Sequence, residues 1–192
     1  MLGRRHADAP LVAGPVLAWR AWALAGRRGS LRLLPVAGSR RPWPQRRPVR
    51  ALCSKAHLHR VPDVRCTCGV HATRELDLLR GTRSPAAVGT VALWGTIVEH
   101  VLGYRARLAY PRSLTLVCSA CFWRPGTDLW PGPTVVAGVP GGGRLPLCEH
   151  HLHTALEARV PVLEVIPADE AIGSLFEGYG IELLGAAGGR HP

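Results

Sequence analysis

Alternating apolar and polar residues along the chain predict short β-strands more often than helices. Residues 87–99 show this alternation most clearly, because Val91, Leu93 and Ile97 fall on one face of an extended segment and the intervening residues on the other. Gly89 and Gly95 interrupt the pattern, which predicts bends or bulges within the strand. We therefore expect a half-buried strand here.

A second strand is expected to run back beside the first. Residues 100–104 form the predicted turn, residues 105–110 the returning strand and residues 114–117 a further short strand. This hairpin would set Glu99 opposite Arg105, an oppositely charged cross-strand pair.

The N-terminal part of the chain has a similar pattern. Apolar runs at residues 16–24 and 30–36 flank a turn with the sequence GRRG, which predicts a β-hairpin. Residues 37–50 carry three prolines and five arginines, so we expect an exposed loop, with Trp43 folded back onto the core.

Helical signals are few and short. Thr73 is a possible N-cap and Gly81 a possible stop, which predicts about two turns between them. Residues 149–159 and 168–179 have apolar residues at helical spacing, with a possible strand at 161–166 between them. Residues 124–146 are dominated by Gly and Pro, which predicts a mobile loop.

These elements predict an α+β fold with a small β-rich body, zinc-binding loops, a C-terminal treble-clef-like knuckle and short helices. The expected segments are a disordered tail at 1–15, a β-rich domain at 16–117, a zinc-knuckle module with a Gly/Pro-rich loop at 118–160 and a strand–helix tail at 161–192.

Cysteine and histidine are gathered in two groups, and the C-terminal group has the more specific spacing. Cys118 and Cys121 form a Cys-x2-Cys pair after a predicted strand, and Cys148 and His151 open a predicted helix. Zinc in a structural role takes four such nitrogen and sulfur ligands. His150 is an alternative to His151, His153 is expected to lie outside the ligand set, and buried thiols without metal are the alternative for the cysteines.

The N-terminal group offers Cys53, His59, Cys66 and Cys68, again three thiols and one imidazole. Its Cys-x-Cys step is tighter than the common zinc spacing, and Gly69 supplies a backbone tolerant of positive φ. His57 and His71 are alternative fourth ligands. The sequence thus predicts up to two structural zinc ions, and with them no disulfides.

The net charge of +11 is concentrated near the N-terminus. Residues 1–60 hold 13 of the 24 Lys and Arg residues against one acidic residue, leaving 11 basic and 12 acidic residues for the rest. Such a segment can bind phosphate backbones, and the candidate contacts are Arg40, Arg41, Arg46, Arg47 and Arg50. The alternative is a solvated surface whose arginines reflect a GC-rich genome.

Other function classes have less support. No uninterrupted apolar run approaches the 18 residues of a membrane-spanning helix, and Arg20 interrupts the one candidate for a cleaved presequence. Glu99 and His100 are a possible acid–base pair with Arg105 as an anion clamp, but neighbours on a strand point to opposite faces. No small-molecule substrate is indicated, and catalysis is the least expected function.

Several short motifs together resemble a known protein family. They are Trp19-Arg20-Ala21-Trp22, then Cys53, His59 and Pro62, then Cys66-Thr67-Cys68-Gly69-Val70-His71-Ala72, Gly89-x-Val91-x-Leu93-Trp94-Gly95, Glu99-His100, Gly103-Tyr104-Arg105-Ala106 and Tyr110-Pro111. This set is similar to a family of small Cys/His-containing proteins of high-GC actinobacteria that has no established activity. The resemblance covers roughly residues 16–121, with a looser match at Cys148 to His151. It implies a bacterial cytoplasmic protein in which Trp19 to Trp22 belong to the fold.

The sequence therefore predicts a zinc-stabilised binding protein that contacts nucleic acid through its Arg-rich N-terminal third. The alternatives are an adaptor that binds a protein partner and, less expected, a zinc-dependent enzyme.

Overall fold

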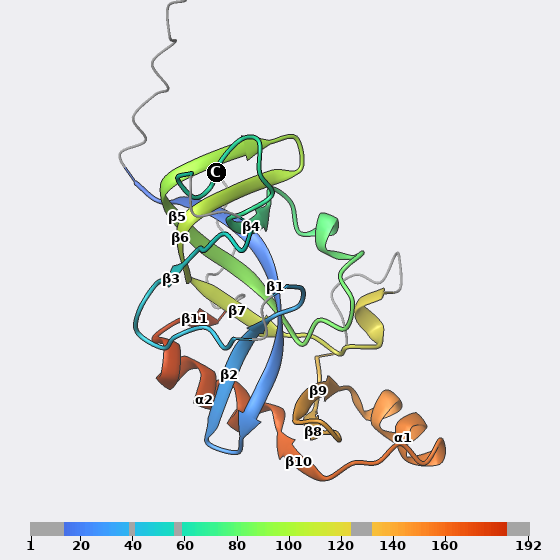
Figure 1. Ribbon diagram of the computed structural model, residues 1–192. Coiled ribbons are helices and arrows are strands. Elements are labelled where there is room, and N and C mark those ends of the chain that lie inside the picture. Colours follow the sequence, from blue (N-terminus) through green and yellow to red (C-terminus); the bar gives the residue numbers. More distant parts are fainter. Residues whose placement is uncertain (1–13, 39–40, 56–58, 124–131, 184–192) are drawn as a thin grey trace, which may run out of the picture.

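The computed structural model describes residues 14–38, 41–55, 59–123 and 132–183, and within these the protein is β-rich with two short α-helices (Figure 1). The predicted α+β class is confirmed at this level. Most of the predicted tail at 1–15 lies outside the described residues.

Four strands close into a ring. β1 (Val16–Arg27) pairs with both β4 (Val70–Thr73) and β5 (Ala87–His100), and both of these pair with β6 (Gly103–Pro111). The order β1-β4-β6-β5 thus returns to β1 and encloses a small barrel. The β1–β4 junction is the weakest, since Trp19 and Thr73 are its one paired position among the described residues.

The long strand β1 changes partners along its length. Its first part lies beside β5, and its second part forms the predicted hairpin with β2 (Ser30–Pro35). The end of β1 also pairs with β9 (Gly143–Leu147), which continues the sheet through β8 (Val135–Gly138) and β10 (Glu164–Pro167). The shorter elements are β3 (Val49–Arg50) beside β6, β7 (Ser113–Leu116) beside β5, β11 (Glu182–Leu183) beside β7, and the 3-10 turns η1 (Asp77–Leu79) and η2 (Cys121–Trp123).

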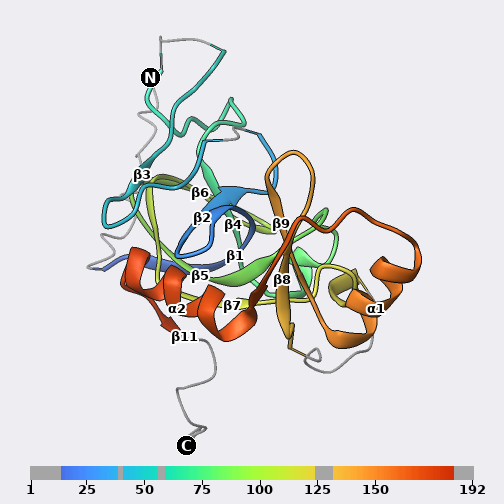
Figure 2. The same ribbon diagram turned by 90° about the horizontal axis from the view of Figure 1, so that it is seen from below.

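The main core lies between this sheet and the helix α2 (Ala168–Tyr179), whereas α1 (Glu149–Glu157) lies apart at the far side (Figure 2). Leu175 and Tyr179 of α2 are buried with Leu31 and Leu33 of β2. Trp43 is 3% exposed, as the sequence predicted, and its ring meets Trp22 edge-on at 5.5 Å.

One predicted helix is absent. Residues 70–73 form β4, and η1 is the only helical turn between Thr73 and Gly81. The Thr73 hydroxyl donates to the carbonyls of Trp19 and Glu75 and so does not cap a helix. The helix prediction was wrong because the backbone N–H groups of Leu79 and Arg80 donate to the carbonyls three residues back, those of Leu76 and Asp77, which makes a single 3-10 turn.

The 124–146 loop prediction was wrong for its second part. Residues 135–138 and 143–147 are the strands β8 and β9, joined by a turn in which Gly141 and Gly142 have positive φ. Gly and Pro therefore build a tight hairpin turn and not a mobile loop. Residues 124–131 lie outside the described part.

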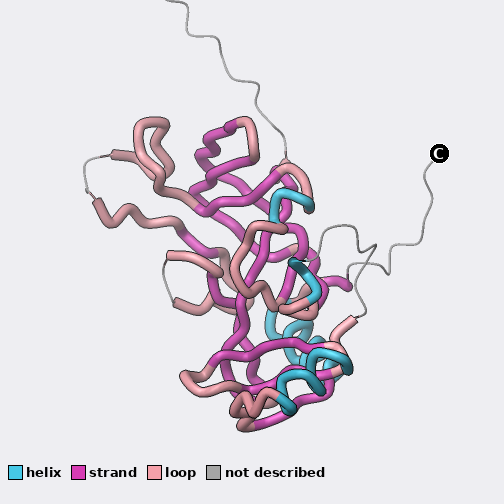
Figure 3. Tube along the Cα trace, turned by 90° about the vertical axis from the view of Figure 1, so that its right-hand side faces the viewer, coloured by secondary structure: helices cyan, strands magenta, loops and turns pink. Residues whose placement is uncertain are grey.

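The three segments predicted from residue 16 onward contribute strands to one sheet, because β9 pairs with β1 and β10 pairs with β8. Strands extend through most of the described fold (Figure 3). The division at residues 117 and 160 stays a prediction. Neither α-helix of the described chain has the length and apolar character needed to cross a bilayer.

Candidate metal centres

Two groups of Cys and His side chains converge in the folded chain. One consists of Cys53, His59, Cys66 and Cys68, the other of Cys118, Cys121, Cys148 and His151, and within each group the ligand atoms lie within 4.8 Å of one another. All six cysteines are free thiols. Each group therefore has a geometry that can hold a metal ion.

The C-terminal group is built by a turn and a helix start. Cys118 follows β7 and Cys121 begins η2, whereas Cys148 is the residue before α1 and His151 lies in its first turn. The Nδ1 atom of His151 is 3.5, 3.3 and 3.2 Å from the sulfur atoms of Cys118, Cys121 and Cys148. One imidazole nitrogen thus faces three sulfur atoms.

This group lies in a small apolar cluster of its own. Its cysteines are buried with Ala137 of β8 and Leu147 of β9, and Leu152 and Ala155 of α1 pack against them. The backbone N–H of Ser119 donates to the Pro146 carbonyl at 3.0 Å, which ties the cysteine turn to β9. The helix and the hairpin therefore meet at the thiols.

The thiols of this group differ in acidity. Burial disfavours the Cys118 thiolate, but hydrogen bonds from the backbone N–H groups of Cys148, Cys121 and Ala120 outweigh it, so the pKa of Cys118 lies below its ordinary value. Burial, and then the neighbouring Cys118 side chain, raises the pKa of Cys121 to about 12. A metal ion among the sulfur atoms reverses this second effect, because it stabilises each thiolate that it contacts.

The N-terminal group lies in the segment leading to β4, in the upper part of Figure 1 and away from α1. The sulfur atoms of Cys53 and Cys66 are 3.7 Å apart. Arg105 of β6 holds the Cys-x-Cys turn, since one of its guanidinium nitrogens donates to the carbonyls of Asp63, Cys66 and Cys68. Gly69 has φ +126°, and a Cβ there would lie 2.9 Å from Arg105 Cβ.

Charge in this group also favours a cation. The Arg60 carbonyl, 3.0 Å from Nδ1, and then the Cys53 thiol raise the pKa of His59 to about 9. Burial raises the pKa of Cys68 above its ordinary value. A metal ion held by this group would bind the neutral imidazole and the thiolates, so it would have to displace their protons.

The structure distinguishes among the candidate histidines. His59 and His151 join the groups, whereas His71 Nε2 lies 2.8 Å from the Thr67 carbonyl oxygen and His150 meets the His151 ring edge-on. His153 lies 3.7 Å from Glu157. His57 lies outside the described residues.

The candidate nucleic-acid contacts are only partly placed. Arg41, Arg46, Arg47 and Arg50 are exposed, and the Arg46 guanidinium donates to the Glu177 carbonyl at 3.1 Å. Arg40 lies outside the described residues.

Arg50 lines a hollow that the sequence did not indicate. It has a volume of about 590 Å³ and is lined by Arg50, Arg60, Arg107 and His59 among others, with no acidic residue in its lining. Arg107 was missed because it comes to Arg50 only through the pairing of β3 with β6, and Arg60 lies in the segment between β3 and β4, whose path the sequence pattern did not predict.

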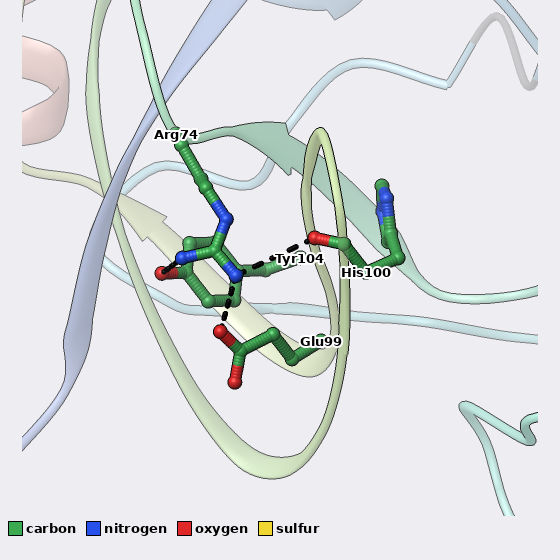
Figure 4. Close-up of polar contacts among 4 residues, drawn as sticks. All are labelled: Arg74, Glu99, His100 and Tyr104. Atoms are coloured by element: carbon green, nitrogen blue, oxygen red, sulfur yellow. Dashed lines mark hydrogen bonds and ion pairs between the residues drawn. The ribbon is translucent and has the colours of Figure 1, made fainter.

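The proposed acid–base pair does not assemble (Figure 4). Glu99 forms an ion pair with Arg74, whose guanidinium also donates to the Tyr104 hydroxyl at 2.9 Å, and the His100 imidazole points away from the carboxylate. The expected pairing of Glu99 with Arg105 was wrong. His100 pairs with Gly103, so the turn is two residues long, and Tyr104 lies opposite Glu99.

Comparisons of the chain with protein-family models, with curated proteins and with solved structures find no match.

Proposed function

We propose that the protein is a zinc-stabilised binding protein whose two Cys3His groups each hold one structural zinc ion. The observation that carries the proposal is the distribution of the thiols: all six cysteines fall into two groups of three, and each group contains one imidazole within 4.8 Å. Zinc in structural sites takes four such ligands in a tetrahedron and leaves no position for water or substrate. This donor set favours a structural over a catalytic role.

The C-terminal group supports a treble-clef-like arrangement. Its first two ligands lie in a turn after a strand, and its last two lie at the start of α1. The resemblance to the actinobacterial Cys/His family and the cytoplasmic location that it implies are further parts of this proposal.

Metal analysis of purified protein tests the zinc assignment. We expect two zinc atoms per chain in the wild type and one each in Cys68→Ser and Cys121→Ser. His71→Gln and His150→Gln are matched controls, because both histidines lie beside a group without joining it. Wild-type protein without zinc, or with disulfides in place of thiols, would contradict the proposal.

The proposed partner is nucleic acid. Arg50, Arg60 and Arg107 line one hollow without a neighbouring carboxylate in its lining, which suits a phosphate backbone. Arg41 and Arg47 are exposed in the segment that leads to Arg50. Contacts of this kind give affinity that depends on salt and little on sequence.

Fluorescence anisotropy with a labelled 20-base-pair DNA duplex tests this partner. We expect log affinity to fall linearly with log salt, and each lost phosphate contact to reduce the slope by about 0.9. Arg50→Gln and Arg107→Gln should each reduce it, while Arg27→Gln, on the hairpin of β1 and β2, should not. Binding that is independent of salt would reject the nucleic-acid function and leave the zinc assignment intact.

An adaptor function is the second candidate, and an apolar surface favours it. Leu156, Val160, Leu163 and Val165 are all exposed, Leu163 by 70%, along the end of α1 and the edge strand β10. Leu163→Glu should remove binding of a protein partner and leave DNA affinity unchanged. Trp43 does not contribute to such a surface because it is buried, and Trp130 lies outside the described residues.

A further inference from the structure

A cavity lies where β1 and β4 separate. Its volume is about 1220 Å³, and its lining comes from the middle of β1, from β4, from the region of η1 and from residues 35–38, 41–44 and 48–54. β1 and β4 pair at Trp19 and Thr73 alone among the described residues, so the ring is least tightly closed here. The volume exceeds the 300–1,000 Å³ or so of typical ligand pockets.

The walls of the cavity are mainly apolar, but its ionisable lining residues are basic or neutral. Trp19, Trp43 and Val70 are among the apolar lining residues, together with several prolines. Arg20, Arg41 and Arg50 supply positive charge, and no Asp or Glu belongs to the lining. A ligand of matching chemistry has an apolar body and a negative charge.

Arg20 lies on the face of β1 whose neighbouring side chains belong to the core. Ala18, Trp22 and Leu24 of β1 lie in the main core, and side chains two residues apart on a strand share a face. Arg20 therefore points to the apolar side of β1. Its guanidinium lies 5.0 Å from the centre of the Trp43 ring.

The hydrogen bonds of this guanidinium are incomplete. One terminal nitrogen donates to the His71 carbonyl, but the Nε atom is buried without a partner. Arg20 takes part in none of the ion pairs found among the described residues. Burial lowers the pKa of Arg20 to about 10.

Arg20 is half-buried, and a cation that is partly removed from water is costly unless a carboxylate or another acceptor pairs with it. The planar guanidinium matches a carboxylate through parallel N–H donors. An external carboxylate would supply both the missing charge and the missing acceptor.

We propose that this cavity binds an organic carboxylate with an apolar body, with the carboxylate on Arg20 and the body against the apolar lining around Trp43. The proposal goes beyond the zinc and nucleic-acid functions. Cys53 of the N-terminal metal group also lines the cavity, so the test uses zinc-loaded protein.

Isothermal titration calorimetry with two probes of nearly equal shape tests the charge requirement. The probes are naphthalene-2-carboxylate and its neutral amide, naphthalene-2-carboxamide. A charge-assisted hydrogen bond should make the carboxylate bind the wild type about ten- to a hundredfold more tightly. Arg20→Gln should remove this preference, whereas Arg27→Gln, at the exposed end of the same strand, should keep it.

A measurement on the wild type tests the proposal even if the Arg20→Gln variant does not fold. Nuclear Overhauser contacts between the naphthalene protons of the carboxylate and the indole of Trp43 are expected. Three results would each overturn the proposal. The wild type could bind both probes with equal affinity, or a folded Arg20→Gln variant could keep the preference for the carboxylate. The nuclear Overhauser contacts could also be confined to residues outside the lining. Loss of DNA binding alone would leave it standing.

Discussion

Single side chains connect distant parts of this protein, and Tyr179 is the clearest example. Its hydroxyl donates to the Trp43 carbonyl at 2.8 Å and accepts from the Leu33 backbone N–H at 3.1 Å. The side chain is 1% exposed, so water cannot replace it. One hydroxyl therefore joins α2, β2 and the segment that covers the cavity.

We expect Tyr179→Phe to lower the free energy of unfolding by about 2 kcal/mol, because it leaves a buried donor and a buried acceptor unpaired. Urea denaturation of the zinc-loaded protein measures this. Tyr104→Phe is the control, since that hydroxyl binds Arg74 at a half-buried position, and its loss should cost less than about 1 kcal/mol. Equal losses would contradict the role of Tyr179.

Gly89 is needed for close packing of strands. A Cβ at this position would overlap the Ser113 carbonyl oxygen and lie 2.7 Å from Leu114 Cα. Of the two positions predicted for a bulge in β5, Gly95 is where one occurs: the register shifts between Trp94 and Ile97, and Gly95 has φ +79°. Gly89 thus interrupts the pattern of side chains in β5 because β7 lies too close for a Cβ at this position.

Gly89→Ala should lower stability by about 1–3 kcal/mol, as overpacking does. Gly173→Ala is a matched control because a Cβ at that exposed position of α2 meets nothing within 4 Å, and it should stabilise the helix by about 0.5–1 kcal/mol. Thermal denaturation of both variants shows whether each substitution lowers or raises the stability of the protein. A stable Gly89→Ala variant would show that β7 can move away.

At the scale of elements, we expect α1 to depend on metal bound at the C-terminal Cys/His group. It has nine residues, none of them fully buried, and helices shorter than about 12–15 residues are marginal in water. Its contact with the rest of the fold runs through Cys148, Leu152 and Ala155. Structural zinc sites contribute on the order of 10 kcal/mol at neutral pH, enough to hold such a helix.

Chelation at pH 7 should therefore increase amide hydrogen exchange in α1, β8 and β9 first, while the centre of β5 and β6 stays protected. Mass-spectrometric exchange with and without chelator measures this. The Cys121→Ser variant should give the same pattern without chelator. Unchanged protection in α1 after complete metal removal would contradict its dependence on zinc.

At the scale of the whole molecule, the sheet joins the N-terminal and C-terminal parts of the described chain. β9 pairs with β1, β10 extends the same sheet, and α2 packs on β2. We expect the zinc-loaded protein to unfold in one cooperative transition, with equal calorimetric and van't Hoff enthalpies. Two transitions, one for residues 16–117 and one for the remainder, would instead support the predicted domain boundary.

The sequence by itself determined much of the local structure and the composition of the metal groups. Strand periodicity in residues 16–24 and 87–99, the first hairpin and both α-helices follow from neighbouring residues. Cysteine spacing likewise separated the two groups of three. These features depend on side-chain alternation and short loops, which act within a few residues.

Only the tertiary structure decided which distant groups meet. It grouped His59 and not His71 with the thiols and paired Glu99 with Arg74. It also reduced the helix expected after residue 73 to the single 3-10 turn η1 and placed Arg20 against the Trp43 ring. Each outcome depends on pairing between segments far apart in the chain, and local periodicity carries no information on that pairing. The physical reason is that strand partners are fixed by hydrogen bonds and burial across the whole ring.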